Sequence, residues 1–138
     1  MLTKQQTEQE TELFPQLLAT SVLTANNYPM KHQQLRNQLM QRRDYFVEGM
    51  DSLKEFWSYE AIQGGLYYWV TWRGDSLSRT QWRLFLEENL AIAPSFLFGR
   101  DSQHFRMNYT RLNEENRMLF FQKIKKITDI LKQQKKER

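Results

Sequence analysis

The sequence predicts an α/β (α+β) fold, a two-layer sandwich in which helices cover a small, mostly antiparallel sheet of three or four strands. Three observations support this fold class: helical periodicity near both ends of the chain, strand-like segments in its second half, and a further helix between those segments. Strands separated by a helix and flanked by helices are typical of a layered domain. A chain of 138 residues is long enough for one such domain with its own core.

Two helices are expected in the N-terminal part of the chain. Residues 1–12 are polar, and the apolar stretch 13–23 predicts a short helix that ends before the turn signal at residues 26–29. From Lys31 to about residue 56, apolar side chains recur at helical spacing, which predicts one long amphipathic helix. Its apolar stripe consists of Leu35, Leu39, Phe46, Met50, Leu53 and Trp57. We therefore expect an N-terminal segment with a short helix, residues 1–30, and a main domain, residues 31–138.

The first strand and the third helix follow a glycine pair at Gly64 and Gly65. Residues 66–72 are aromatic or β-branched at nearly every position, which predicts a strand that is covered on both faces. Ser78 and Gln81 have the spacing of a capping box, so a helix is expected to begin there.

The remaining elements are two strands and a C-terminal helix. A short apolar segment at residues 90–93 precedes a break at Pro94, and residues 104–109 alternate strictly between apolar and polar side chains. Asn113, followed by two glutamates, is expected to cap the last helix. The predicted order is therefore helix, helix, strand, helix, strand, strand, helix.

Composition excludes several classes of site. The chain has no cysteine, which excludes disulfides, cysteine-ligated zinc and thiol nucleophiles. Its two histidines, His32 and His104, lack the spacing of a zinc motif, so we expect no metal site. The motifs of serine hydrolases, dinucleotide-binding folds and phosphate-binding loops are also missing from the sequence, and we assign no catalytic residue.

The positive charge is confined to one end of the chain. The formal net charge is +4, but residues 123–138 alone carry seven basic and two acidic side chains. Basic residues in the last turns of a helix complement its dipole, and no aromatic residue lies among them to stack on a base. We therefore expect no direct binding to nucleic acid. The polar N-terminus and the lack of a long apolar run predict neither a secretory signal nor a membrane span, so we expect a cytoplasmic protein.

Arg106 is the candidate binding residue. The alternation of residues 104–109 places Phe105, Met107 and Tyr109 on one face of a strand and His104, Arg106 and Asn108 on the other. The polar face could simply be solvated, or Arg106 could bind a carboxylate or phosphate through its planar fork of donors, with Asn108 beside it. Spacing alone leaves both interpretations open.

The chain resembles a known family in four separated motifs. They are Leu35-Arg36 with Arg43-Asp44, Gly64-Gly65 with Trp69-Val70, Ile92 and Pro94 with Phe96 and Phe98, and Phe105-Arg106 with Asn108-Tyr109. In this order and with these gaps, over about residues 16–131, they resemble the C-terminal small domain of class I (fold type I) aminotransferases, which depend on pyridoxal 5'-phosphate. A stretch from Asn27 to Arg36 makes the resemblance closest to the aminotransferase-like domain of MocR regulators of the GntR family.

The resemblance implies roles for a few residues. Arg106 matches the arginine that binds the α-carboxylate of the amino acid substrate, and Gly64, Gly65 and Asn108 match neighbours of that site. The chain departs from the family in having Gln63 before the glycine pair and Ser95 after Pro94. Nothing in it matches the lysine that forms the Schiff base, or the residues that hold the cofactor, all of which belong to the family's large domain.

The sequence thus predicts a C-terminal domain or fragment of an aminotransferase or of a MocR-type transcription regulator. We expect it to be inactive alone, to bind no pyridoxal phosphate by itself, and to contribute Arg106 to a site that a large cofactor-binding domain completes. Residues 31–138 would be the small domain, and residues 1–30 a remnant of the large domain or a linker to it. Its expected partners are that domain, an amino acid, and a second copy in a homodimer. The alternative is a stand-alone protein-interaction module on the same scaffold, with an exposed apolar surface around residues 13–23 and 67–72.

Overall fold

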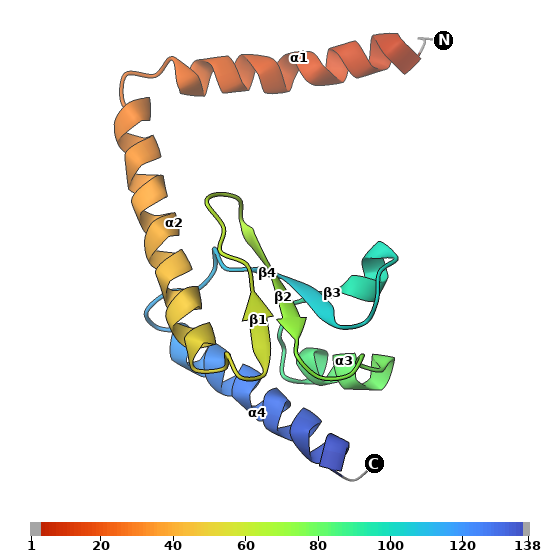
Figure 1. Cartoon of the computed structure of the whole chain (residues 1–138). Coiled ribbons are helices and arrows are strands. Elements are labelled where there is room, and N and C mark those ends of the chain that lie inside the picture. The colour runs from red at the N-terminus through yellow and green to blue at the C-terminus, as the bar shows by residue number, and fades with distance from the viewer. Residues whose placement is uncertain (1–3, 137–138) are drawn as a thin grey trace. The chain divides into compact units, whose positions relative to one another are not determined.

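The computed structural model describes residues 4–136, with side chains from residue 13 onward, and divides into two compact units, residues 1–38 and 39–138 (Figure 1). The first unit contains helix α1 (Lys4–Leu23) and the beginning of helix α2 (Tyr28–Asp51). Helix α1 is longer than the short helix expected from residues 13–23. The polar residues before that stretch are mostly glutamine and glutamate, which have a high helix propensity.

The second unit is built around one antiparallel sheet of four strands, which confirms the predicted fold class. The strands are β1 (Trp57–Tyr59), β2 (Tyr67–Trp72), β3 (Ala93–Pro94) and β4 (His104–Asn108). Their order across the sheet is β1-β2-β4-β3, and every neighbouring pair is antiparallel (Figure 1). Strand β4 is therefore hydrogen-bonded on both sides, by β2 and by β3.

Strand β1 is absent from the prediction, which extended the second helix to residue 56. Helix α2 ends at Asp51, and Leu53 and Trp57 are buried from a turn and from β1. Apolar residues continued at helical spacing through that turn, and a strand of three residues is too short to show alternation. The first residue of the predicted apolar stripe is not buried either, since Leu35, in the first unit, is 52% exposed.

The C-terminal half follows the prediction with small shifts. Helix α3 (Arg79–Glu87) begins after Ser78, whose side chain forms the expected capping box with Gln81. The strand expected at residues 90–93 is reduced to β3 and runs directly into a short 3₁₀ helix, η1 (Ser95–Phe98). Helix α4 (Arg117–Lys136) starts later than expected, because Asn113 accepts hydrogen bonds within a turn that precedes the helix.

The core of the second unit lies between one face of the sheet and helices α2, α3 and α4. Fully buried aromatic and aliphatic side chains come from all four components: Trp57, Tyr68, Val70 and Phe105 from the strands, Phe46 and Met50 from α2, Phe85 from α3, and Ile124 and Ile127 from α4. The indole Nε1 of Trp57 donates a hydrogen bond of 2.8 Å to the Oγ1 of Thr128, so its polar atom is satisfied inside the core. On the other face of β2, Tyr67 is exposed and Trp69 and Thr71 are only partly buried, so the expectation that both faces of this strand are covered is wrong.

Candidate functional site

The face of the sheet opposite the core carries the candidate site. We call it the open face; its side chains on β2 and β4 are Tyr67, Trp69, Thr71, His104, Arg106 and Asn108. Along β4 the pattern is strict, since Phe105 and Met107 are buried while Arg106 between them is exposed. Strand pairing places Arg106 opposite Trp69 of β2 and opposite Ala93 of β3. The structure thus puts the predicted binding residue in the middle of an uncovered face.

Arg106 lies against aromatic rings. Its Cζ atom is 4.4 Å from the ring centroid of Tyr67 and 5.1 Å from that of Phe98. Among the described side chains, residues 13–136, no carboxylate, carbonyl or amide oxygen forms a hydrogen bond or ion pair with its guanidinium. A guanidinium has five N–H donors in one plane, and ring faces occupy none of them. Arg106 therefore has its donors available to an external anion.

A histidine–aspartate pair lies on the same face. The His104 ring stacks on Trp69 with a centroid distance of 5.7 Å, and its Nδ1 is 2.7 Å from Oδ1 of Asp101. This hydrogen bond is the main cause that lowers the pKa of the Asp101 carboxyl, and the backbone N–H of Gln103 contributes further. Because Asp101 occupies one ring nitrogen of His104, the pair is fixed beside Trp69.

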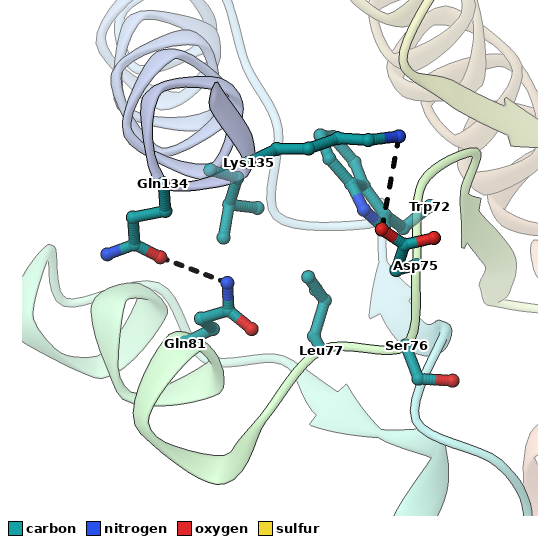
Figure 2. A pocket seen from close by; sticks show the side chains of 8 residues that line it. Trp72, Asp75, Ser76, Leu77, Gln81, Gln134 and Lys135 are labelled. Atoms are coloured by element: carbon teal, nitrogen blue, oxygen red, sulfur yellow. Dashed lines mark hydrogen bonds and ion pairs between the residues drawn. The ribbon is translucent and has the colours of Figure 1, made fainter. Parts of the chain in front are cut away.

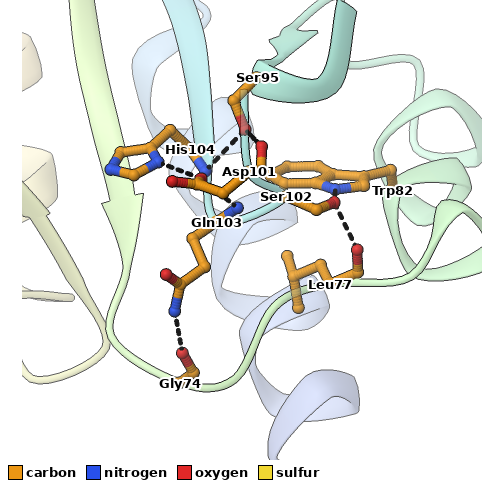
Figure 3. A network of polar contacts seen from close by, with 8 residues as sticks. All are labelled: Gly74, Leu77, Trp82, Ser95, Asp101, Ser102, Gln103 and His104. Atoms are coloured by element: carbon orange, nitrogen blue, oxygen red, sulfur yellow. Dashed lines mark hydrogen bonds and ion pairs between the residues drawn. The ribbon is translucent and has the colours of Figure 1, made fainter. Parts of the chain in front are cut away.

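The loop between β3 and β4, which carries Phe98, is held by a network of hydrogen bonds (Figure 3). The buried Ser95 hydroxyl donates to the carbonyl of Asp101 and accepts from the backbone N–H of His104 at 3.2 Å. On the other side of the loop, the indole Nε1 of Trp82 donates to the Oγ of Ser102 at 2.6 Å. The hydroxyl of Ser95, which departs from the resembled motif, is therefore used inside the fold.

The other predicted neighbours of the site have structural roles. Asn108 lies on the open face, and its Oδ1 accepts from the backbone N–H of Thr110 at 2.8 Å and from its hydroxyl at 2.7 Å. Gly65 precedes β2 with φ +87°, a conformation that favours glycine, and its carbonyl accepts from the Tyr109 hydroxyl at 2.8 Å. Gly64 has open space where a side chain would be. The structure thus places Asn108 next to Arg106 and uses Gly65 to tie the start of β2 to the end of β4.

Sequence reasoning missed Tyr67, Phe98 and Asp101 as parts of this site. The sequence pattern predicts Tyr67 in a strand covered on both faces, and it shows Phe98 only as part of one of the four motifs. What joins them to Arg106 is the register of β2 on β4 and the path of the loop after β3. Neither follows from the local sequence pattern.

The hollows on the second unit include two that helix α4 helps to line. The smaller one, about 200 Å³, lies between α3 and α4, where the Gln81 amide donates to Gln134 at 2.9 Å and Lys135 is 3.9 Å from Asp75 (Figure 2). The larger one, about 550 Å³, is a groove that is lined in part by Tyr67 and Asn108 of the open face. Its remaining lining is Asn89, Leu90, Ala91, Arg111, Leu112, Asn116, Leu119, Phe120 and Lys123.

The open face does not fit a pyridoxal phosphate site by itself. A Schiff base to the cofactor requires a lysine amine, and none of the six open-face side chains is a lysine. Lys123, which lines the neighbouring groove, donates to the backbone carbonyl of Glu88 at 2.7 Å. The described part of the chain also holds no cluster of three or more histidine and acidic side chains that could bind a metal ion. None of the described helices combines the length and the apolar character needed to cross a membrane.

Solved structures with the same fold are aminotransferases. The α-aminoadipate aminotransferase LysN of Thermus thermophilus superposes with a TM-score of 0.70 at 18% identity, over 79% of this chain and 29% of that one. The multiple substrate aminotransferase of Thermococcus profundus gives a TM-score of 0.68 at 18% identity, over 79% and 28% of the two chains. A tetra mutant of the Thermus thermophilus aspartate aminotransferase gives 0.61 at 22% identity, over 75% and 28%. The chain thus spans less than a third of the length of these enzymes.

The sequence comparison assigns the family. No curated protein gives a significant match. The family model described as aminotransferase class I and II matches residues 6–124, which is most of the chain. The four-stranded sheet with its helices is an aminotransferase small-domain-like fold, as the solved structures show. The chain therefore belongs to the class I and II aminotransferase family.

Proposed function

We propose that this chain binds the α-carboxylate of an amino acid through Arg106, in an active site that a larger cofactor-binding domain completes. The observation that carries the proposal is the state of the Arg106 side chain. It is exposed at the centre of the open face and makes no hydrogen bond or ion pair with the residues that the structure describes. In this proposal residues 31–138 form the small domain, and residues 1–30 are a remnant of the larger domain or a linker to it.

The position of Arg106 suits a carboxylate. Strand β4 is paired on both sides, so the backbone that carries Arg106 is fixed. A guanidinium binds a carboxylate with two parallel hydrogen bonds, which fixes the orientation of the ligand as well as its place. An amino acid held in this way has its Cα bonds oriented for chemistry that another part of the site performs.

Pyridoxal phosphate is the cofactor of the family, and when bound it withdraws electrons from the Cα atom of the amino acid. This chain offers no lysine on the open face to hold it. We therefore predict no transaminase activity for the chain alone. A Schiff-base absorbance that develops with pyridoxal phosphate and is lost when one lysine is replaced would contradict this prediction.

The longer protein in this proposal is either an aminotransferase or a MocR-type transcription regulator. The stretch from Asn27 to Arg36 favours the regulator, on the resemblance described above. Arg106 has the same proposed role in both, which is to bind the carboxylate of an amino acid substrate or ligand.

The test uses N-(5'-phosphopyridoxyl)-L-leucine, the compound bound in the LysN structure, and its matched amine without the carboxylate. Both are titrated into the purified chain while the Arg106 Nε–Hε signal is followed by NMR. We expect a shift at Arg106 that requires the carboxylate, and an affinity that falls about tenfold to a hundredfold in Arg106→Gln. Arg83→Gln, which removes an exposed guanidinium on α3, is the matched control.

The double comparison decides the outcome. In Arg106→Gln the two compounds should bind equally, because the group that distinguishes them is gone. If the compound with the carboxylate still binds better in this variant, or if Arg83→Gln has the same effect, Arg106 is not the carboxylate site.

A protein-interaction module is the second candidate, and the apolar side chains of α1 favour it. Six of them, each between 52% and 73% exposed, are Leu13, Phe14, Leu17, Leu18, Val22 and Leu23. An apolar surface of this kind marks an interface. A monodisperse monomer or a defined homodimer in size-exclusion chromatography with light scattering would favour the module, and a poorly soluble, polydisperse chain would favour the fragment of a larger enzyme.

A further inference from the structure

We propose that Tyr67 and Phe98 are positioning residues for Arg106, forming an aromatic clamp that holds the guanidinium in place before any ligand arrives. The ligand assigned to this site rests on the function proposed above, whereas the clamp itself rests on the geometry around Arg106. We use the name aromatic clamp for Tyr67 and Phe98 only.

The two rings reach Arg106 from opposite sides of its strand. Tyr67 belongs to β2 and Phe98 follows β3, and β4 lies between these two strands. The Cζ atom of Arg106 is 4.4 Å from the Tyr67 centroid and 5.1 Å from the Phe98 centroid, both within the range of cation–π attraction. On the β3 side, Arg106 is paired with Ala93. The side chain of Ala93 is short, so it leaves room for the Phe98 ring to contact Arg106.

The Phe98 ring is itself held in place. It packs against Trp69 with a centroid distance of 5.9 Å, and Trp69 stacks on His104, which is bonded to Asp101. Directly after Phe98, Gly99 has φ +69° and turns the chain back toward β4. A clamp that is supported in this way restricts Arg106 more than two freely moving rings would.

Core packing does not account for these two rings. Tyr67 is 44% exposed and Phe98 is 47% exposed, and neither belongs to the buried cluster beneath the sheet. The two rings attract the positive charge of Arg106, and this attraction leaves its N–H groups free to form hydrogen bonds with a ligand. A long side chain that is ordered in advance loses less rotamer freedom when it binds, so the clamp should raise affinity without touching the ligand.

The direct test measures the mobility of Arg106 in the free chain. Nitrogen-15 relaxation of its Nε–Hε group and the rate of rotation about its Nε–Cζ bond are compared in wild type, Tyr67→Leu and Phe98→Leu. We expect faster motion in both variants, and near wild-type motion in Tyr67→Phe, which keeps the ring and loses only the hydroxyl. Leu97→Ala, at a neighbouring residue that is 64% exposed, is the matched control.

The second measurement is the affinity for N-(5'-phosphopyridoxyl)-L-leucine. Tyr67→Leu and Phe98→Leu should each weaken binding about threefold, with binding restored in Tyr67→Phe. If Arg106 moves as slowly in both leucine variants as in wild type, the clamp is wrong, whatever Arg106 binds. If mobility rises in both variants but Arg106→Gln leaves binding unchanged, the clamp stands and the proposed function fails.

Discussion

Two arginines of this chain lie over tyrosine rings at the same distance and yet differ in what surrounds them. The Cζ atom of Arg117, at the start of α4, is 4.4 Å from the Tyr45 centroid, and that of Arg106 is 4.4 Å from the Tyr67 centroid. Arg117 also donates to carboxylate oxygens of Glu48 at 2.9 Å and of Glu114 at 3.0 Å. Arg106 has no such acceptor among the residues that the structure describes.

The comparison shows that the hydrogen-bond acceptors around an arginine distinguish a structural role from a binding role. Arg117 joins α4 to α2 through Glu48, so the fold itself uses its donors. Arg106 lies on a face that the fold leaves uncovered, where its donors face solvent and are available to an external anion. If this view is right, substitutions around Arg117 should mainly change stability, and substitution of Arg106 should mainly change binding.

The largest effect is expected at Phe105, the residue before Arg106 on β4. Its side chain is fully buried and packs with its ring centroid 5.3 Å from that of Trp57 and 5.5 Å from that of Phe85. Phe105→Ala should lower the free energy of unfolding by about 3–5 kcal/mol, because it removes a large apolar side chain and leaves a cavity. Urea denaturation measures this, and a loss below about 1 kcal/mol would contradict the assignment of the two faces of β4.

A smaller loss of stability is expected at Arg117. Arg117→Gln removes both ion pairs and the contact with Tyr45, and should lower the free energy of unfolding by about 1 kcal/mol or less, because the carboxylates are well exposed. The loss should shrink further at high salt, which screens exposed ion pairs. Binding of N-(5'-phosphopyridoxyl)-L-leucine should be unchanged, and weaker binding would remove the contrast between the two arginines.

The pH dependence of stability near Arg117 follows from Tyr45 and Glu114. The Tyr45 hydroxyl donates to Glu114 at 2.7 Å, and this hydrogen bond lowers the pKa of the Glu114 carboxyl and raises the pKa of Tyr45. Stability from Glu114 is therefore present above the ordinary glutamate pKa of about 4.3 and is lost as the pH falls through the lowered value. Stability from Tyr45 is present below the ordinary tyrosine pKa of about 10 and is lost as the pH rises through the raised value.

Tyr45→Phe removes the hydrogen bond that is the largest cause of both shifts. Unfolding measured between neutral pH and about pH 3 should then show a shallower loss of stability in the variant than in wild type. Equal slopes in the two proteins would show that the Tyr45–Glu114 contact is not formed in solution.

The smallest effect on stability is expected at Arg106. Arg106→Gln removes an exposed side chain that has no hydrogen-bond partner among the described residues and loses only its weak contacts with the Tyr67 and Phe98 rings, so the free energy of unfolding should fall by about 0.5 kcal/mol. Thermal and urea unfolding measure this change. A clear loss of stability would show that the fold depends on Arg106, and would weaken its assignment as a binding residue.

The sequence was most informative where periodicity was long and regular. The alternation of residues 104–109 correctly separated Phe105 from Arg106, and the spacing of Ser78 and Gln81 correctly placed the start of α3. The prediction was wrong where apolar residues continued at helical spacing beyond the end of a helix. Trp57, for example, belongs to strand β1 and not to the preceding helix. It also failed for β2, where an apolar run suggested two covered faces although aromatic side chains remain partly exposed on one of them.

The sequence by itself determined the kinds of element, their order except for β1, the absence of cysteine chemistry, and the side of its strand on which Arg106 lies. These properties depend on residues that are near one another in the chain. Only the tertiary structure decided which face of the sheet stays open and which rings flank Arg106. Those properties depend on the pairing of β4 with β2 and β3, and such pairing between distant segments is set by the packing of the whole unit.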